Sequence, residues 1–526
     1  MSSDHLAEEK APAQATALPN SVEHWTAREP DRAVLFEADN EMTWAQIDER
    51  ADRLAEGLAR HGVGAGDVVA VRTLVRMEWV VIDAALAKLR CRLLGMNWRL
   101  TPTEARFMLT DSDARAVVCD DQDPAAFAEA LTGTGVVVAV SMDVPAAGFV
   151  DYAELAATER RRRLSAGSAP LVIYTAGTTG RPKGVVMGPR PGREQDAAEF
   201  QADIASYAAG MRDDVYLATL PFSHGAGPNQ VRRVLSHGGR IVFQRRFDPV
   251  GALDLINRYG VTTWSTVPTM LQRVAALPPD VLERKRPTHL RMVVTGAAPS
   301  TPELKSWLED YFGEILYESY GTTEVGLVSI APPGLRRTKP GSCGLPYRHV
   351  EVDIRDADGT VLPAGTTGEI WVRTPVVLSR YVNAPPLGPD VLDEAGYFRT
   401  GDVGRLDEGG YLFITDRVKD MIVSGGVNIY PAEIEAALQR LEPVFAAAAI
   451  GIPDEEFGEQ VKAFVELKPG ATAAADELIA GLRGVLASYK QPRSIEIVDQ
   501  LPRNHMGKLL KKDLRAPYWE GKERKI

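Results

Sequence analysis

One segment, about a third of the way along the chain, combines residues that bind phosphate. It reads YTAGTTGRPKGVVM, spans residues 174–187 and follows the apolar run Leu171-Val172-Ile173. Glycines let a backbone approach an anion closely, while amide N–H groups, hydroxyls and an ammonium group supply donors and charge. A Walker A loop needs Gly-x4-Gly-Lys-Ser/Thr, but here Lys183 stands three residues after Gly180. The segment therefore predicts a phosphate-binding loop of another kind.

Four further segments share a strand-like run that ends in small, polar or glycine-rich residues. In open α/β sheets, ligands bind beyond the carboxyl ends of the strands. We therefore expect the first two segments to join the loop around Thr178 and Thr179 at one crevice, although each alone is also compatible with an ordinary turn. The four segments are VVTGAAPS (293–300), YESYGTTEVG (317–326), YFRTGDVG (397–404) and LPRNHMGKLLKKDLR (501–515).

The elements that position these segments alternate in type between about residues 21 and 419. TWAQIDERADRLAEGLARHGV predicts a helix with Thr43 as its N-terminal cap. Its neighbours along the chain predict buried strands separated by turns and helices, which favours the α/β class with layered sheets. The predicted strands include DVVAVRT, RIVFQ, VTTWSTV, RMVVTG and EILYESY.

After Asp416 the pattern changes to a small α+β unit. NIYPAEIEAALQRL predicts a helix with Pro431 in its first turn. FAAAAIGIP, QVKAFVELK and SIEIVD predict strands, and AADELIAGLRGVLASY predicts a second helix. The charged ITDRVKDMIVSGG is the candidate linker. We expect a flexible tail at 1–20, a large multi-sheet α/β N-terminal domain at 21–416, a hinge at 417–420, and a small mobile α+β C-terminal domain at 421–526.

Composition excludes several classes of function. The chain has 526 residues, 45% of them hydrophobic, and a formal net charge of −11. That charge disfavours binding to nucleic acid or to an anionic membrane. The basic run 160–163 is interpreted as a solvated stretch in a loop or at a helix end. No run approaches ~18 apolar residues, the N-terminus lacks a signal-peptide pattern, and three unpaired cysteines fit a reducing cytoplasm.

Taken in order, the five chemistry-bearing segments resemble the adenylate-forming superfamily. This group comprises acyl- and aryl-CoA synthetases, peptide-synthetase adenylation domains and luciferases. The resemblance runs from about Ser21 to Leu514 and is strongest to acyl-CoA synthetases of the fatty-acid and 4-coumarate type. It implies an ATP-dependent ligase that forms an acyl-adenylate and then an acyl-CoA thioester. The implied substrates and cofactors are a small carboxylic acid, ATP, Mg²⁺ and CoA.

The resemblance also implies roles for residues around the phosphates. Charge builds on the leaving pyrophosphate when a carboxylate attacks the α-phosphorus, and hydroxyls, amides and an ammonium stabilise it. Glu324 would hold Mg²⁺ and Thr323 would touch the α-phosphate. The alternative to these roles is that Lys183 is an ordinary surface lysine and that Glu324 is a surface carboxylate at the start of a helix. The residues implied to close over the β- and γ-phosphates are Thr175, Gly177, Thr178, Thr179, Gly180 and Lys183.

Other positions match contacts to the nucleoside. Asp402 would accept hydrogen bonds from both ribose hydroxyls, and Arg417 would make a second ribose contact. Tyr320 would stack on adenine, with a core tyrosine as the alternative. The small residues Gly296, Ala297 and Ala298 would lie against the flat ring. The remaining nucleotide-binding positions of this motif are Glu318, Ser319, Gly321 and Thr322.

The C-terminal unit carries the residues implied for catalysis and for CoA. Lys508 matches the lysine that reaches the substrate carboxylate and the α-phosphate, where it neutralises two anions. Lys419 falls at the hinge about which the small domain swings between the two half-reactions. Asn428 stands where related ligases carry glutamine. The glycine-rich turn implied to line the pantetheine tunnel is Ser424, Gly425 and Gly426.

The segment PFSHGAGPNQ, residues 221–230, matches the border of the carboxylate pocket. His224 would act as a base toward the CoA thiol or as a plain wall. No acidic residue occurs from Leu220 to Gln230, so an α-ammonium group would lack a partner. We expect an acyl chain or aryl ring to meet Phe222, His224 and Trp264, although Trp264 is also compatible with a core position. The stretch MGPRPGREQDAAEF departs from the short connection expected at its place, and one interpretation is a loop over the site.

Three other functions are alternatives to this ligase. A related enzyme would pass the acyl group to a carrier protein or another nucleophile instead of CoA. A catalytically inactive nucleotide sensor would lack the lysine or the metal carboxylate, yet Lys508 and Glu324 are present. An interaction scaffold would carry extended apolar or charged binding stretches, which the sequence does not show. The sequence leaves open whether the chain is a monomer or a homodimer.

Overall fold

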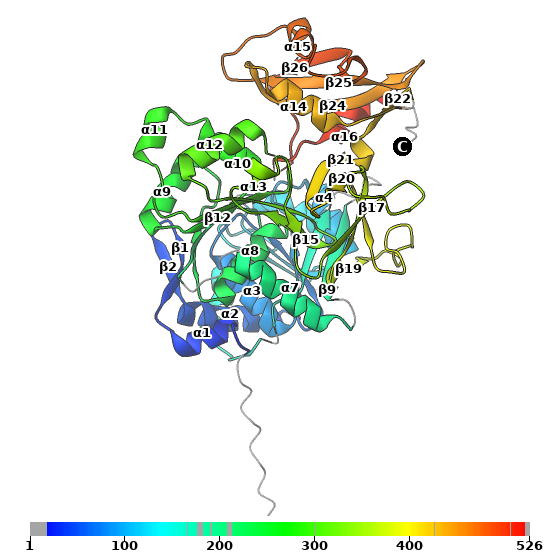
Figure 1. Cartoon of the computed structure of the whole chain (residues 1–526). Helices are drawn as coiled ribbons and strands as arrows, with labels where there is room; N and C mark the ends of the chain where they lie inside the picture. Colours follow the sequence, from blue (N-terminus) through cyan, green and yellow to red (C-terminus); the bar gives the residue numbers. More distant parts are fainter. Residues whose placement is uncertain are drawn as a thin grey trace, which may run out of the picture.

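The fold is described from a computed structural model of the chain. It describes residues 18–121, 123–165, 167–175, 182–189, 192–207, 213–298, 300–425, 427–504 and 507–520. Almost all of the expected tail lies outside these residues. The α/β class is confirmed, with a large N-terminal domain and a smaller C-terminal domain that lies above it in Figure 1.

Two large sheets organise the N-terminal domain. The first follows the order β16-β15-β14-β13-β12-β10-β11-β1-β2 and the second β19-β9-β8-β4-β3-β5-β6-β7. The strands of the first are Leu345–Pro346, Gly326–Ala331, Leu316–Thr322, Met292–Gly296, Thr263–Thr266, Val215–Ala218, Arg240–Phe243, Ala33–Glu37 and Asn40–Thr43. Those of the second are Val376–Tyr381, Lys183–Pro189, Leu171–Thr175, Arg92–Gly95, Val68–Arg72, Ala114–Cys119, Val138–Ser141 and Val150–Asp151.

A smaller sheet completes this domain, and a further sheet forms the C-terminal one. The small sheet follows the order β17-β18-β20-β21, with strands Glu351–Arg355, Gly368–Arg373, Phe398–Leu406 and Leu412–Arg417. The C-terminal sheet follows β23-β22-β25-β24, with β26 paired to β25. Its strands are Val427–Ile429, Ile422–Ser424, Gly458–Leu467, Val444–Asp454 and Ser494–Val498.

Helices pack on these sheets and begin where the sequence supplies caps. Thr43 and Gln46 form a capping box at the start of α2, as the sequence predicted for Thr43. In the N-terminal domain the helices are α1 Val22–Arg28, α2 Trp44–Arg60, α3 Glu78–Leu89, α4 Pro102–Asp111, α5 Pro124–Leu131, α6 Tyr152–Ala156, α7 Glu194–Tyr207, α8 Ala226–Ser236, α9 Pro249–Tyr259, α10 Pro268–Ala275, α11 Pro279–Arg284, α12 Pro302–Phe312 and α13 Leu335–Thr338. In the C-terminal domain they are α14 Pro431–Gln439, α15 Ala475–Gly481 and α16 Lys511–Arg515.

The largest core joins α2 and α3 to strands of both large sheets. Trp44 and Trp79 are fully buried in it. Phe222 also belongs to it, since its ring lies 4.5 Å from that of Trp79 and is 2% exposed. Trp264 is fully buried in a second core. The expectation that Phe222 and Trp264 line the acid pocket is therefore not supported, because packing in these cores occupies both rings.

Two predictions about individual segments are corrected. AADELIAGLRGVLASY is helical only over α15, because the chain turns at Gly484, whose φ of 77° is incompatible with a continuing helix. Leu482 and Leu486 remain buried after the helix ends. The stretch after Met187 does not form one long loop, since its second part forms α7, where Phe200 packs on Tyr347.

The basic run 160–163 is not simply solvated. Arg160 pairs with Asp52 at 2.9 Å and with Asp48 at 3.0 Å, and Arg163 pairs with Glu56 at 2.8 Å. The three carboxylates are spaced four residues apart on α2 and therefore share one helix face. This run binds the connection after α6 to α2.

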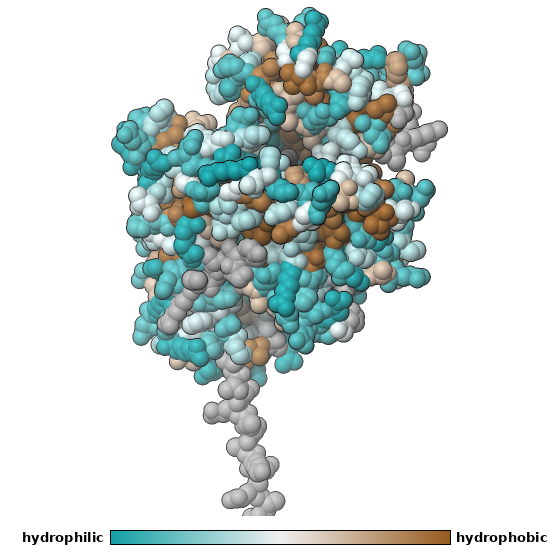
Figure 2. Space-filling view, in the orientation of Figure 1, coloured by the Kyte–Doolittle hydropathy of each residue, from teal (hydrophilic) through white to brown (hydrophobic). Residues whose placement is uncertain are grey.

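The passage between the domains is short. β21 ends at Arg417, a single 3-10 turn covers Val418–Asp420, and β22 begins at Ile422. Arg515 of α16 pairs with Asp420 at 2.9 Å. On the face shown in Figure 2 a notch separates the C-terminal domain from the large domain. Among the described residues no helix combines the length and apolarity that a membrane crossing requires.

Candidate active site

Strand ends of both large sheets meet at the candidate site. β13 and β14 run parallel, with Gly296 opposite Ser319. A Cβ at Gly296 would lie 2.7 Å from both the carbonyl oxygen and Oγ of Ser319, so only glycine permits this approach. Ala297 follows with a left-handed φ of 65°. The predicted neighbourhood of VVTGAAPS and YESYGTTEVG is thus confirmed.

The predicted phosphate loop begins beside the predicted metal carboxylate. Thr175, at the end of β8, donates from Oγ1 to Oε1 of Glu324 over 3.5 Å. Lys183 begins β9, and its Nζ lies 5.1 Å from the centre of the Tyr381 ring. Burial, and then the charge of Glu324, raise the pKa of Tyr381 to about 12. Lys183 is half-buried rather than a free surface lysine, so a hydroxyl, a carboxylate and an ammonium gather here.

Asp402 links two segments that the sequence predicts to bind the nucleoside. Tyr320 donates its hydroxyl to Oδ2 of Asp402 at 2.7 Å, and Nε of Arg417 lies 2.9 Å from Oδ1. The Tyr320 ring is 8% exposed and packs in a hydrophobic cluster, so this side chain is largely a core residue with a polar tip at the site. Burial, and then Asp402, hold the pKa of Tyr320 well above its usual value. Asp402 is thus fixed by two partners.

Lys508 reaches this group from the C-terminal domain. Burial, and then the cation of Arg417, lower the pKa of Lys508 to about 7, while Asp402 opposes that shift. His224 lies just before α8 of the large domain, and burial followed by the charge of Lys508 lowers its pKa to about 4. The imidazole is therefore neutral at pH 7. Lys508 is thus within electrostatic reach of His224, Asp402 and Arg417.

Lys419 lies within the same electrostatic group. Burial, and then Arg417, lower the pKa of its ammonium. Lys508 in turn feels the charge of Lys419. Three cationic side chains from the linker and the lysine loop therefore surround the Asp402 carboxylate. Such a concentration of positive charge suits a polyanionic ligand.

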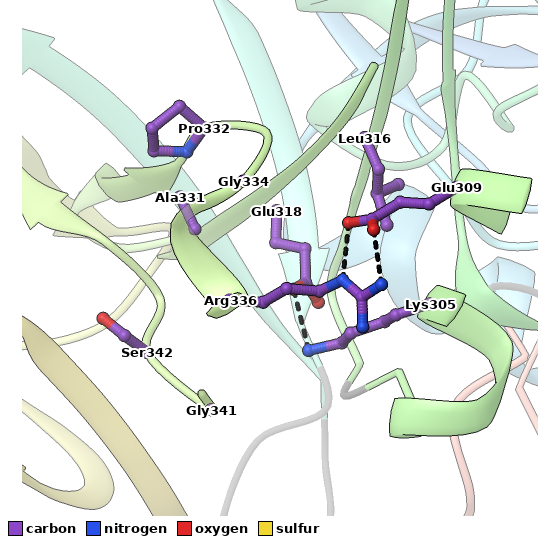
Figure 3. A pocket seen from close by; sticks show the side chains of 10 residues that line it. All are labelled: Lys305, Glu309, Leu316, Glu318, Ala331, Pro332, Gly334, Arg336, Gly341 and Ser342. Carbon is purple, nitrogen blue, oxygen red and sulfur yellow. Dashed lines mark hydrogen bonds and ion pairs between the residues drawn. The ribbon is translucent and has the colours of Figure 1, made fainter. Parts of the chain in front are cut away.

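Glu318 is placed differently. Its Oε2 pairs with Nζ of Lys305 on α12 at 2.7 Å. Figure 3 shows this pair beside the Arg336–Glu309 pair in a small pocket, of which Glu318 is the one lining residue that the sequence predicted as part of the site. Its carboxylate is thus already neutralised by Lys305.

The residues predicted for CoA lie on an exposed hairpin. Ser424 and Val427 pair at the turn between β22 and β23, and Gly425 adopts a φ of 58°. Gly425 and Asn428 are exposed to solvent. The predicted positions Gly177, Thr178, Thr179, Gly180 and Gly426 lie outside the described residues.

Comparison with known proteins identifies the family. The family model for the AMP-binding enzyme matches residues 22–382, and that for the AMP-binding enzyme C-terminal domain matches residues 433–508. The chain belongs to the adenylate-forming superfamily. The resemblance seen in the motifs is thereby confirmed.

Adenylate-forming relatives match over almost the whole chain. The 2-succinylbenzoate–CoA ligase of Geobacillus kaustophilus is 34% identical over 503 residues, which cover 95% of this chain and 98% of the relative. The fatty acid–[acyl-carrier-protein] ligase ScoC of Streptomyces coeruleorubidus is 32% identical, with 98% of each chain covered. ATP-bound MatB from Rhodopseudomonas palustris superposes with a TM-score of 0.84 at 30% identity, covering 95% of this chain and 99% of MatB. The chain is accordingly an AMP-forming acid–thiol ligase.

Two residues of this adenylate-forming site were missed by sequence reasoning. Tyr381 ends β19 and packs on Lys183, but nothing in its local sequence marks it. Thr269 is the second residue of α10 and lies against Gly507 of the lysine loop. The nearby Met270 packs beside Leu220 and Val267. Contacts between segments far apart in the sequence leave no periodic pattern, which explains both omissions.

Proposed function

We propose that the chain is an ATP-dependent carboxylate–CoA ligase for an acid without an α-ammonium group. The carboxylate attacks the α-phosphorus of ATP, pyrophosphate leaves, and an acyl-adenylate forms. The CoA thiol then attacks the acyl carbon, AMP leaves, and a proton is released. The observation that carries the proposal is the placement of Lys508 beside Asp402, Arg417 and His224.

Lys508 acts during the first step. Its ammonium lies where two anions, the carboxylate and the α-phosphate, must approach each other, and it reduces their repulsion. Asp402 accepts hydrogen bonds from the ribose hydroxyls, and Arg417 orients Asp402. Thr175 and Lys183, with the glycine-rich segment between them, take the leaving phosphates. Thr323 contacts the α-phosphate.

The residues present fit a magnesium ion. Glu324 supplies one carboxylate beside the hydroxyl of Thr175. Proteins hold Mg²⁺ with one or two carboxylates together with phosphate oxygens and water, which matches this donor set. A bound Mg²⁺ would neutralise charge on the phosphates.

The second step requires another placement of the C-terminal domain. In this structure Gly425 and Asn428 face solvent while Lys508 is turned toward the large domain. We infer that rotation about Lys419 exchanges them, so that the turn at Ser424 lines the entry of CoA. The boundaries 417–420 for the hinge belong to this proposal.

The acid pocket favours an apolar acyl or aryl group. The segment from Leu220 to Gln230 carries no carboxylate that would pair with an ammonium group. Leu220, Val267 and Met270 form an apolar cluster next to it. A buried and unpaired ammonium costs several kcal/mol, so an amino acid would bind poorly. The two relatives described above act, by their names, on 2-succinylbenzoate and on a fatty acid.

Carboxylate-dependent exchange of pyrophosphate into ATP tests the first step. A panel of fatty, aryl, alicyclic and amino acids is measured, and the best acids are then assayed for AMP and thioester formation with CoA. We expect fatty or aryl acids to support exchange and CoA to drive AMP release. An amino acid that exceeds every other acid would overturn the assignment of substrate class.

A carrier protein is the second candidate acceptor, favoured by the match to ScoC. AMP release is compared with CoA and with a phosphopantetheinylated acyl carrier protein. If AMP is released with the carrier protein but not with CoA, the carrier protein replaces CoA as the proposed acceptor.

A further inference from the structure

The loop that carries Lys508 touches the large domain at one unusually close point. A Cβ added to Gly507 would lie 2.1 Å from Oγ1 of Thr269 and 2.6 Å from its Cγ2. Real Cβ atoms do not approach heavy atoms this closely, so a side chain at position 507 cannot coexist with Thr269 in this pose. The φ of Gly507 is 73°, a second reason for glycine here.

Gly507 and Lys508 move together because the loop is held by its own hydrogen bonds. The amide of Asn504 donates to the carbonyl of Lys508 at 2.8 Å, and the Lys508 amide donates to the Asn504 side chain at 2.9 Å. Arg503 donates to the carbonyl of Gly507 at 3.0 Å. The depth at which Gly507 docks therefore determines where Lys508 lies.

Thr269 is held in place by the helix that carries it. It stands in the first turn of α10, between Pro268 and Met270. The helix is anchored by Leu271 and Val274, which are fully buried in the core of the large domain. The apolar cluster of Leu220, Val267 and Met270 adjoins it, next to the segment of His224. The lysine loop thus docks on the element that borders the proposed acid pocket.

We propose that Thr269 is a positioning residue for Lys508. Van der Waals contact between its side chain and the Cα of Gly507 limits how closely the loop docks on the large domain. This contact therefore positions the Lys508 ammonium near Asp402 and His224. The contact joins the two domains, so it operates in the adenylating pose and is absent once the C-terminal domain rotates. This inference rests on the proposed two-step function.

A rescue experiment separates this role from general stability. Gly507→Ala is compared with Gly507→Ala combined with Thr269→Ala or Thr269→Gly. Gly470→Ala is the matched control, because Gly470 has a φ of 78° in the same domain and open space around an added Cβ. Pyrophosphate exchange reports the first step, and thioester formation from supplied acyl-adenylate and CoA reports the second.

We expect Gly507→Ala to lower exchange about 10- to 100-fold, the cost of overpacking one contact. Thioester formation from the supplied adenylate should stay within about twofold, as in Gly470→Ala. Thr269→Ala should restore exchange partly and Thr269→Gly more fully, since Cβ of Thr269 itself would lie 2.7 Å from the added methyl. Equal loss in both half-reactions, or no rescue, would overturn the proposal.

Hydrogen exchange gives a readout that needs no acid substrate. Amides over 265–275 should exchange faster in Gly507→Ala than in the wild type, and the double variant with Thr269→Gly should recover the protection of Thr269→Gly alone. Unchanged protection in Gly507→Ala would contradict the docking contact. If no carboxylic acid supports pyrophosphate exchange by the wild type, the proposed function is contradicted. The hydrogen-exchange measurement still tests the contact between Gly507 and Thr269 in that case.

Discussion

At the scale of single residues, the proposed role of the Lys508 ammonium implies a pH dependence, because the pKa of this group is about 7. The charged form neutralises the approaching anions, so loss of its proton removes the effect. The kcat/KM for ATP in pyrophosphate exchange should therefore fall about tenfold per pH unit above pH ~7. The neutral His224, with a pKa of about 4, adds no limb between pH 5 and 8.

Lys508→Arg provides the matched control for this profile. A guanidinium stays protonated throughout this range, so the decline above pH 7 should disappear even though the rate is lower. Profiles from pH 6 to 9 of both proteins decide the point. An identical decline in the arginine variant would assign the titration to another group.

The sequence predicted which residue types belong to the site but not how they meet. Asp402, Glu324 and Lys508 were predicted from motifs, and their roles stay predictions. The pairing of Glu318 with Lys305 and the proximity of His224 to Lys508 arise from packing between distant segments. Trp264 was ambiguous because a strand buried on both faces does not distinguish a pocket from a core. The burial of Phe222 was not predicted, because it lies in the turn between β10 and α8, where no periodic pattern marks a core position.

At the scale of elements, the approach of β13 to β14 shapes the nucleotide side of the site. Gly296→Ala should force the strands apart, since its Cβ would meet Ser319 at 2.7 Å. We expect a loss of ~1–3 kcal/mol in the free energy of unfolding and a higher KM for ATP. Urea denaturation and exchange kinetics measure both effects.

Gly64→Ala is the comparison for that variant, because no heavy atom lies within 4 Å of its added Cβ. It should change stability by at most ~0.5 kcal/mol. If Gly296→Ala and Gly64→Ala have the same stability and the same KM for ATP, the close approach of β13 and β14 does not require glycine at position 296.

Element boundaries were predictable where a local signal existed. The cap at Thr43 marks the start of α2 correctly. Pro431 begins α14 and so lies in its first turn as predicted, but Asn428 and Ile429, which were included in that predicted helix, form part of β23. The end of α15 was not predicted, because glycines are tolerated inside helices and only the left-handed turn at Gly484 stops this one. The ion pairs of Arg160 with α2 depend on contacts over more than 100 residues of chain, which no local pattern reveals.

At the scale of the whole molecule, the proposed two-step function requires a linker that allows two poses. Lys419 is the middle residue of the 3-10 turn Val418–Asp420. Proline at 419 disfavours a helical conformation at Val418, so Lys419→Pro should destabilise the pose seen here. We expect pyrophosphate exchange to fall about tenfold or more while thioester formation from supplied acyl-adenylate is far less affected.

Lys419→Ala accompanies that variant, since it removes the charge without restricting the backbone. It should impair the two half-reactions less selectively. Near wild-type rates for Lys419→Pro in both assays would contradict a hinge at this residue.

The most direct test of the account is Lys508→Ala assayed in the two half-reactions separately. We predict that carboxylate-dependent pyrophosphate exchange falls ~10²-fold or more, comparable with the loss of one preorganised donor to a developing charge. Conversion of supplied acyl-adenylate and CoA to thioester and AMP should continue near the wild-type rate, because Lys508 has then rotated away. An equal loss in both half-reactions, or unimpaired exchange, would contradict the assignment of Lys508 to adenylate formation in the pose described.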